Sequence, residues 1–322
     1  MRLKYAALWN RVNILVHNAA ERNKAMTKRI TEAVRAGRVL VSDGAWGTFL
    51  YRKGLKPGEC PERWCLERFA DVRDIAKSYI DAGADMVETN SFGGSRIKLK
   101  SFGLDGKAAE INEAAARASR EAAGDRLVIG SMGPTGKLLI MEEVTREELY
   151  DAFREQAVAL EKGSADALCI ETMMDAEEAA IAVRAAKENT GCEVICTFTF
   201  DRTASGGYRT MMGITPAEAA AAALEAGADI IGTNCGNGME RMIEIVNEMR
   251  AACPDAPILV HANAGLPEVV DGNNVYPETP EFMAALVPQI VQAGANIVGG
   301  CCGTTPAHIA AMRLAVDRMV QR

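Results

Sequence analysis

The chain has 322 residues and a formal net charge of −7, with 48% hydrophobic, 25% charged and 5% aromatic residues. An acidic chain with few aromatic side chains does not suit nucleic-acid binding, which depends on basic patches and stacking rings. No apolar run approaches the roughly 18 residues of a membrane span. We therefore expect a soluble globular protein without nucleic-acid or membrane partners.

The N-terminal segment, residues 1–28, differs from the rest of the chain because it is basic and rich in asparagine. Its longest apolar patch is shorter than the about 7–15 residues of a signal-peptide core. We expect residues 1–28 to be an extension, either helical or poorly ordered, with no assigned function. Residues 29–322 are then expected to form a single domain.

A short phrase recurs along this domain, in which a helical stretch ends in glycine and a brief apolar run follows. Its copies are D-A-G-A-D-M-V-E-T-N at 81–90, E-K-G-S-A-D-A-L-C-I-E-T at 161–172, E-A-G-A-D-I-I-G-T-N at 225–234 and Q-A-G-A-N-I-V-G-G at 292–300. Glycine accepts the left-handed conformation that stops a helix. We expect that conformation at Gly83, Gly163, Gly227 and Gly294. Each apolar run that follows predicts a strand buried on both faces.

Four further apolar runs, at residues 38–42, 126–130, 193–199 and 258–262, raise the number of predicted strands to eight. Alanine-rich amphipathic segments predict helices between the strands, for example at residues 148–162, 176–189, 216–226 and 280–293. This alternation predicts an α/β fold, a (β/α)8 barrel of the TIM type. A doubly wound open sheet is the alternative, and the lack of a G-x-G-x-x-G loop after the first strand disfavours it.

In a (β/α)8 barrel the catalytic side chains come from the C-terminal ends of the strands. The polar residues at those ends are, in chain order, Asp43, Glu88, Thr89, Asn90, Ser131, Glu171, Thr172, Thr199, Asn234, Cys235, Asn263, Cys301 and Cys302. Any one of these residues fits a capping or loop role. Three thiols at the ends of the sixth and eighth strands need a different explanation.

The nine cysteines fall into groups by their surroundings. Three lie in or beside strand runs and are expected to be small core residues: Cys169, Cys192 and Cys196. Three others lie in a loop or at the end of a helix: Cys60, Cys65 and Cys253. Cys235, Cys301 and Cys302 differ because they follow buried strands in glycine-rich sequence. The odd count, in a chain too long to need disulfide staples, favours a reducing compartment, the cytoplasm.

Three interpretations compete for Cys235, Cys301 and Cys302, which we call the cysteine trio. A disulfide between the adjacent Cys301 and Cys302 would close a strained ring and leave Cys235 unused. Coincidental burial does not suit glycine-flanked thiols at a barrel mouth. We favour three thiolates that converge on Zn²⁺ at about 2.3 Å, with the fourth tetrahedral position open for a substrate, as in catalytic zinc sites.

The charge of such a zinc site indicates its chemistry. Zn²⁺ with three thiolates has a net negative charge, so it activates water poorly but suits a further thiol, whose proton it displaces at neutral pH. The resulting thiolate keeps its electron density and attacks an electrophilic carbon. We therefore predict alkyl transfer to a thiol. His261, which lies at a strand end, is expected to be a hydrogen-bonded barrel residue rather than a ligand.

Seven motifs follow one another in a recognisable order. They are D-G-A-W-G-T (43–48), E-T-N-S-F (88–92), G-S-M-G-P-T-G (130–136), E-T-M-M-D (171–175), G-T-N-C-G-N-G (232–238), N-A-G-L-P (263–267) and G-G-C-C-G-T-T-P-A-H-I (299–309). The series resembles the homocysteine S-methyltransferase family. Residues 272–277 and the T-T-P-A-H-I ending are most similar to its cobalamin-dependent branch, the homocysteine domain of methionine synthase. The resemblance implies a zinc-binding (β/α)8 barrel over nearly the whole domain.

The resemblance also implies roles for individual residues. Cys235, Cys301 and Cys302 would be the zinc ligands, with the sulfur of homocysteine as the fourth. Asp43 and Glu171 match positions that hold the ammonium group of homocysteine, and carboxylates at strand ends suit that group.

Other positions are assigned supporting roles by the same resemblance. Gly44 and Ser131 are candidates for contacts with the substrate carboxylate. Asn234 and Asn263 are expected to orient the loops and the cysteine ligands from behind.

The sequence departs from the family pattern beside the expected mouth. Met239 stands where the family often has proline, and His261-Ala262 stand where an acidic or aromatic residue followed by proline is commoner. Trp46 has two interpretations: its ring faces a cationic methyl donor, since aromatic rings attract such groups, or it is a packing residue. These departures put the usual acceptor and donor in question.

The methyl donor is expected to come from outside the chain, because no D-x-H-x-x-G motif of a corrinoid ligand is present and the sequence ends shortly after Cys302. A methylated corrinoid protein, S-methylmethionine, S-adenosylmethionine or a betaine would serve. The prediction is a zinc-dependent methyltransferase that converts homocysteine, or a similar thiol, to its methyl thioether. Two alternatives stay open: a component of a multi-protein corrinoid system, and a non-catalytic barrel that binds homocysteine or zinc. A homo-oligomer is compatible with each.

Overall fold

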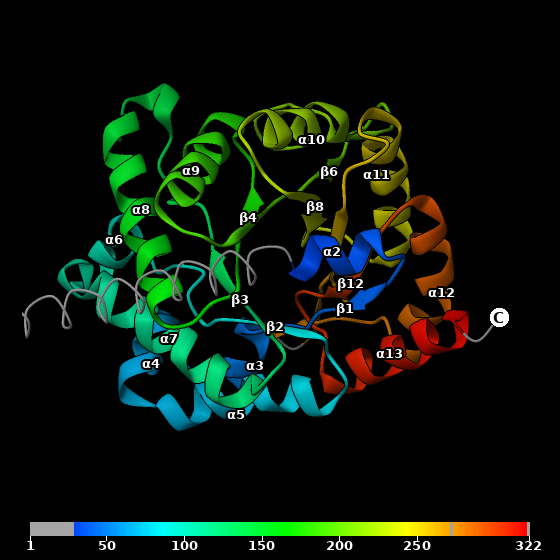
Figure 1. Ribbon diagram of the computed structural model, residues 1–322, viewed down its shortest axis with the longest axis horizontal. Helices are drawn as coiled ribbons and strands as arrows, with labels where there is room; N and C mark the ends of the chain where they lie inside the picture. The colour runs from blue at the N-terminus through cyan, green and yellow to red at the C-terminus, as the bar shows by residue number, and fades with distance from the viewer. Residues whose placement is uncertain (1–28, 271–272, 321–322) are drawn as a thin grey trace, which may run out of the picture.

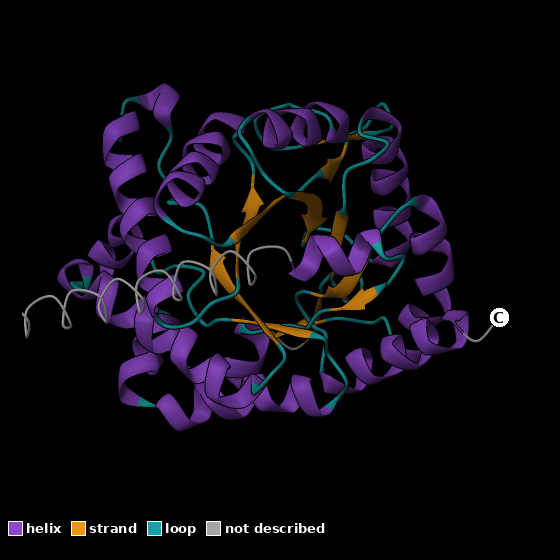
Figure 2. Cartoon of the chain, in the orientation of Figure 1, coloured by secondary structure: helices purple, strands orange, loops and turns teal. Residues whose placement is uncertain are grey.

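The computed structural model describes residues 29–270 and 273–320. Eight parallel strands form one sheet in the order β1-β12-β9-β8-β5-β4-β3-β2. The sheet curls into a nearly closed barrel with helices around its outside, as Figures 1 and 2 show. The strands are β1 Leu40–Val41, β2 Met86–Glu88, β3 Leu127–Met132, β4 Ala167–Met173, β5 Glu193–Phe198, β8 Ile230–Asn234, β9 Ile258–Ala262 and β12 Ile297–Gly300. All eight predicted strands and the (β/α)8 fold are confirmed, whereas the expected extension at residues 1–28 lies outside the described residues.

The helices surround the barrel in chain order. They are α2 Arg29–Arg35, α3 Gly47–Arg52, α4 Trp64–Glu67, α5 Phe69–Asp81, α6 Arg96–Leu99, α7 Ala108–Ala123, α8 Arg146–Lys162, α9 Ala176–Asn189, α10 Pro216–Glu225, α11 Met239–Ala252, α12 Pro280–Ala293 and α13 Pro306–Val320. Two hairpins extend the loops, β6 Asp201–Arg202 with β7 Tyr208–Arg209, and β10 Glu268–Val270 with β11 Asn273–Val275. No helix among the described residues is long and apolar enough to cross a membrane.

The predicted helix limits agree with the structure to within two residues. The predicted segments 176–189 and 280–293 coincide with α9 and α12. Helix α8 starts two residues before its predicted first residue because Thr145 and Glu148 form a capping box, in which each side chain bonds the other's backbone N–H. Helix α10 starts at Pro216 as predicted and ends one residue early, and its N-cap Thr215 forms the same kind of capping box with Glu218.

One of the four glycine predictions is wrong. Gly83, Gly227 and Gly294 have positive φ angles, but Gly163 has φ −76° and the next residue, Ser164, takes the positive angle of 78°. Gly163 has a different reason to be glycine: a Cβ there would lie 2.4 Å from the carbonyl oxygen of Glu113 in α7. The glycine therefore allows a close approach of backbones.

The barrel interior is filled by one apolar layer to which every strand of the sheet contributes. Its members are Leu40, Met86, Leu127, Ile129, Ala167, Cys169, Ile195, Ile230, Leu259 and Ile297, with Ile30 from α2. Helix α2 crosses the N-terminal end of the strands (Figure 1). The Glu193 carboxylate, at the start of β5, accepts the backbone N–H groups of Ile30 and Thr31 at 2.9 and 3.0 Å. This end of the barrel is therefore closed, and a site must open at the other end.

The barrel closes between β1 and β2 through a single residue. The backbone N–H of Asp85 donates to the Val41 carbonyl at 2.7 Å, and the Val41 N–H donates to the Asp85 carboxylate at 2.9 Å. Strand β1 has two residues only, and the Asp85 side chain adds a hydrogen bond to this short junction.

The recurring phrase of the sequence has a common structural role at the N-terminal ends of the strands. The residue after each Gly-Ala or Ser-Ala carries a side chain that accepts a backbone N–H from a neighbouring strand and also contacts a basic side chain. Asp85 binds the Val41 N–H and Arg313, and Asp166 binds the Val128 N–H and Arg120. Asp229 binds the Val194 N–H and Lys187, and Asn296 binds the Ile258 N–H and Arg250. We call these four side chains the base clamps. They fix adjacent strands in register.

Candidate functional site

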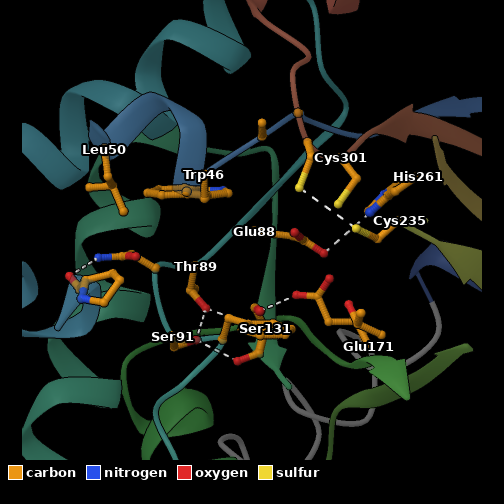
Figure 3. Close-up of a pocket in the computed structure, with 18 of the residues that line it drawn as sticks. Trp46, Leu50, Glu88, Thr89, Ser91, Ser131, Glu171, Cys235, His261 and Cys301 are labelled. Atoms are coloured by element: carbon orange, nitrogen blue, oxygen red, sulfur yellow. Dashed lines mark hydrogen bonds and ion pairs between the residues drawn. The ribbon is translucent and has the colours of Figure 1, made fainter. Parts of the chain in front are cut away.

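A cavity of about 320 Å³ opens at the C-terminal ends of the strands, where the sequence predicts catalytic groups. Its wall consists of residues that follow β1, β2, β3, β4, β8, β9 and β12, and Figure 3 shows them around the open space. Among the predicted site residues, Gly44, Ser131, Glu171 and the cysteine trio line this wall. Asp43, Asn234 and Asn263 are buried but are not part of the lining.

The cysteine trio comes together as predicted. The Sγ atoms of Cys235, Cys301 and Cys302 all lie within 4.8 Å of one another, and Cys235 and Cys302 are 3.8 Å apart. Strand β9 lies between β8 and β12 and fixes both cysteine segments, because the Cys235 N–H donates to the His261 carbonyl at 3.0 Å and the Cys301 N–H donates to the Ala262 carbonyl at 2.7 Å. All nine cysteines are free thiols, so the Cys301–Cys302 disulfide is not formed.

The backbone at Cys235 is unusual. Its φ is 60°, in the left-handed region that a residue with a side chain seldom adopts. Such a conformation persists only where the surrounding structure holds it. Here the hydrogen bond to β9 and the next residue, Gly236 with φ 72°, hold the turn that points Sγ to the other two thiols.

The three thiols influence one another's charge. Hydrogen bonds from the thiols of Cys235 and Cys301 lower the pKa of Cys302 to about 3, and the Tyr276 hydroxyl adds to this effect. Hydrogen bonds with Cys235 and Cys302, together with burial, raise the pKa of Cys301, so the trio by itself favours one thiolate. Three thiolates at this separation would repel one another strongly unless a cation lay between them.

The donor set fits zinc. Three soft thiolates match the ligand preference of Zn²⁺, and a trio that opens on a cavity matches a catalytic rather than a closed structural site. Asn263 is joined to the cysteine segment through its neighbour, because the N–H of Ala264 donates to the Cys302 carbonyl at 2.9 Å. The Oδ1 atom of Asn263 is buried and has no hydrogen-bond partner among the described residues. The cluster is therefore a candidate zinc site.

Glu171, at the end of β4, is held in the wall by side chains from two other strands. Its Oε1 accepts the Ser131 hydroxyl and its Oε2 accepts the Asn234 amide at 3.1 Å. Burial raises the pKa of Glu171 to about 7. The Oδ1 of Asn234 in turn accepts the Thr172 N–H and the Thr197 hydroxyl, each at 2.7 Å. Asn234 directly precedes Cys235. It therefore links the Glu171 turn to the segment that carries this cysteine.

Asp43 lies behind the wall rather than in it. Its Oδ2 accepts the Trp46 indole N–H at 3.0 Å and the Glu88 backbone N–H at 2.9 Å, and its Oδ1 accepts the Ser42 hydroxyl at 3.2 Å. Burial raises the pKa of Asp43 to about 6. Its hydrogen bonds hold two wall residues, Trp46 and Glu88, in place.

Gly44 is a wall residue with a steric requirement. A Cβ there would lie 2.7 Å from the Thr304 hydroxyl oxygen and 2.9 Å from the Tyr79 ring. The chain that follows β1 thus passes close to the segment that carries Cys301 and Cys302. A larger residue would move these two segments apart.

Glu88 and His261 are wall residues that the sequence analysis did not assign to the site. Both are buried, and the His261 Nδ1 lies 3.6 Å from the Glu88 Oε1 (Figure 3). Burial raises the pKa of Glu88, and the charges of Glu171 and Asp43 add to the rise. Burial lowers the pKa of His261 to about 4, so its ring is neutral at pH 7. The expectation of a hydrogen-bonded His261 is wrong for Nε2, which has no partner among the described residues.

The available signal for Glu88 was its place in E-T-N-S-F directly after a strand, which we interpreted as a possible cap. Trp46 combines its two interpretations, since it lines the cavity and also packs against the core. Met239, which replaces the proline of the family pattern, is the fully buried first residue of α11. This departure therefore alters a helix start and not the wall.

These features define a class: a (β/α)8 barrel with a thiol cluster for a soft metal ion and an acidic cavity beside it. The family model of homocysteine S-methyltransferases matches residues 40–316. The chain belongs to the homocysteine S-methyltransferase family, a family of S-methyltransferases. The predicted family membership is confirmed.

Curated relatives and solved structures agree with this assignment. The chain is 33% identical over 302 residues to methionine synthase of Mycobacterium leprae and 32% identical to that of Mycobacterium tuberculosis; each match covers 88% of this chain and 25% of the relative. The chain therefore spans about a quarter of the length of these relatives. The metallated form of the homocysteine methyltransferase MmuM from Escherichia coli has the same fold, with a TM-score of 0.70, 22% identity, and coverage of 86% of this chain and 96% of that one.

Proposed function

We propose that this protein transfers a methyl group to the thiol of homocysteine, giving methionine, with zinc held by Cys235, Cys301 and Cys302. The observation that carries the proposal is the convergence of three thiols, within 4.8 Å of one another, on a cavity with an acidic wall. Family membership supports a thiol acceptor. The cavity volume of about 320 Å³ accommodates an amino acid of this size.

The division of labour follows from the chemistry of the groups. When bound, zinc would lower the pKa of the substrate thiol and so provide a thiolate nucleophile at neutral pH. The thiolate attacks the methyl carbon, and the donor's leaving group departs with the bonding electron pair. The three cysteines hold the metal, and their negative charge leaves electron density on the attacking sulfur.

The remaining predicted residues orient the substrate in this proposal. Glu171 in the wall, with the charge of Asp43 behind it, attracts the substrate ammonium group. Ser131 and the backbone at Gly44, which line the cavity, contact the substrate carboxylate in this proposal. Asn234 acts by holding Glu171.

Asn263 supports the metal-ligand segment, since the N–H of the next residue bonds the Cys302 carbonyl. We propose further that residues 29–322 act as one domain in the cytoplasm and that the methyl donor is supplied in trans. A component of a multi-protein corrinoid system remains the second candidate, because the chain is similar to a quarter of methionine synthase.

The proposal is tested by metal analysis together with methyl transfer. Purified protein is expected to bind about one zinc ion and to methylate homocysteine with at least one member of a panel: a methylated corrinoid protein, S-methylmethionine, S-adenosylmethionine and a betaine. Cys235→Ala is expected to lose zinc and to lower the transfer rate by about a thousandfold or more.

Cys196→Ala is the matched control, because this cysteine is fully buried in β5 away from the cavity. It should keep both zinc and activity. A protein that methylates homocysteine equally well without metal would refute the mechanism. Zinc binding without transfer from any donor would instead favour a non-catalytic barrel.

A further inference from the structure

Among the described residues that line the cavity there are three carboxyl side chains, Glu62, Glu88 and Glu171, and no lysine or arginine. A wall of this composition selects a ligand with a positive charge. The carboxyl groups differ in how many of their oxygens are already hydrogen-bonded, and this difference identifies a second carboxyl that can contact the ligand in addition to Glu171.

Two of the three carboxyl groups are occupied by the protein itself. Glu62 accepts the Gly93 N–H on Oε1 at 2.7 Å and the Cys60 thiol on Oε2 at 3.3 Å. Glu171 accepts the Ser131 hydroxyl on Oε1 and the Asn234 amide on Oε2. These hydrogen bonds leave each group part of its accepting capacity, but they also fix it to the protein.

Glu88 is the exception. It is 7% exposed, and its Oε1 has no hydrogen-bond partner among the described residues. The nearest basic nitrogen, the Nδ1 of His261, is 3.6 Å away, which is too long for a hydrogen bond. Because a buried polar atom without a partner is costly, a native structure seldom retains one unless a ligand or solvent satisfies it.

Glu88 is held in the cavity wall by hydrogen bonds of its backbone. The Glu88 N–H donates to Asp43 at 2.9 Å, and the Glu88 carbonyl accepts the Ser119 hydroxyl at 2.8 Å. Figure 3 shows the side chain extending between Trp46 and the segment of Cys235 and His261. Glu88 and the thiols that would hold the substrate sulfur therefore line the same cavity.

We propose that Glu88 directly binds the ammonium group of the thiol substrate and that Asp43 acts through Glu88 as a positioning residue. The inference rests on the proposed function and deepens it, since it names the contact that selects an amino-acid thiol over a thiol without an amino group. In homocysteine a short carbon chain separates the sulfur from the ammonium nitrogen, as the closeness of Glu88 to the thiol cluster requires.

The test compares two thiols with two carboxyl variants. The thiols are homocysteine and 4-mercaptobutanoate, which has the same chain without the amino group. Binding to zinc-loaded protein is measured by calorimetry, and methyl transfer is measured with the donor that wild type uses. Glu88→Gln removes the charge, and Glu178→Gln is the matched control because Glu178 is also a buried carboxyl but does not line the cavity.

Glu88→Gln is expected to weaken homocysteine binding by about tenfold to a hundredfold, the usual effect of losing a hydrogen bond between charged groups. Its binding of 4-mercaptobutanoate should stay within about twofold of wild type, since that ligand lacks the contact. Glu178→Gln should leave the preference for homocysteine unchanged. Glu88→Asp, which keeps the charge on a shorter side chain, should recover part of the preference, and circular dichroism with zinc content checks that each variant is folded.

An unchanged preference in Glu88→Gln would overturn the inference while leaving the proposed function intact. An equal loss for both thiols would also overturn it, because it would indicate a structural role. If wild-type protein bound neither thiol, the proposed function itself would fail, and the role of Glu88 would fail with it.

Discussion

The two ends of the same barrel strands use acidic residues in opposite ways. At the N-terminal ends, the base clamps Asp85, Asp166 and Asp229 each contact a basic side chain and accept a backbone N–H. At the C-terminal ends, Glu88 and Glu171 are buried, and within the described part of the chain their only basic neighbour is the neutral His261, next to Glu88. Both kinds occur at strand β2: the paired Asp85 directly precedes its first residue, and Glu88 is its last residue.

The difference separates stability from function. A paired carboxylate lowers the free energy of the folded state or costs little, because its charge is compensated. An unpaired buried carboxylate raises the free energy of the folded state until a ligand compensates it. The N-terminal end of the barrel is therefore the stabilising end, and the mouth is the end where stability is given up for ligand binding.

The pH dependence of stability tests this contrast with the largest expected effect. The folded-state pKa values of about 6 for Asp43 and about 7 for Glu171 lie above those of an unfolded chain, about 4. Between these values the folded chain holds protons that the unfolded chain has released, so stability falls as pH rises. Urea unfolding of metal-free protein should show a loss between about pH 4 and pH 7, at most about 3 kcal/mol for Asp43 and about 4 kcal/mol for Glu171.

The combined variant Asp43→Asn with Glu171→Gln is the control for this experiment, because it lacks both titrating groups. Its stability should depend less on pH over the same range. A wild-type stability that was flat or that increased with pH would contradict the unpaired state of the mouth carboxyls.

Removal of a base clamp is expected to have the next largest effect. Asp166→Ala leaves the Val128 N–H without its acceptor and removes the carboxylate that pairs with Arg120, and the Asp166 side chain is 2% exposed. The free energy of unfolding should fall by about 3 kcal/mol. The Michaelis constant for homocysteine, measured below the unfolding transition, should not change; a changed constant would mean that the two ends are not separable.

A substitution at the mouth should change the Michaelis constant and leave the stability nearly unchanged, with a smaller effect in free energy. Glu171→Gln removes a wall charge, and we expect the Michaelis constant for homocysteine to rise about thirtyfold, equivalent to about 2 kcal/mol. Zinc content should stay near one per chain because no cysteine is altered. Thermal unfolding is the second measurement, and a loss of stability as large as that of Asp166→Ala would count against the contrast.

Much of this structure could be predicted from the sequence because it depends on periodic or local signals. The recurring phrase predicts the strands, and the barrel then brings Cys235 to Cys301 and Cys302 without any spacing motif. Gly163 was misassigned because its constraint is a contact with Glu113, far away in the chain. The same limit applies to Asp43 and Glu88. The sequence assigned Asp43 to the site, but Glu88 lines the cavity and Asp43 lies behind it, because the direction of a side chain is not encoded in a local pattern.

The short strand β1 has a consequence for motion. It joins β2 through one backbone hydrogen bond from Asp85, one bond to the Asp85 side chain and the bond from the Glu88 N–H to Asp43, whereas the other neighbouring strands are paired in the sheet. Regions with few hydrogen bonds open locally at the lowest free-energy cost. Amide hydrogen exchange should therefore begin at this junction, and since Asp43 and Gly44 come directly after β1, the rim of the cavity adjoins the part of the barrel that opens most readily.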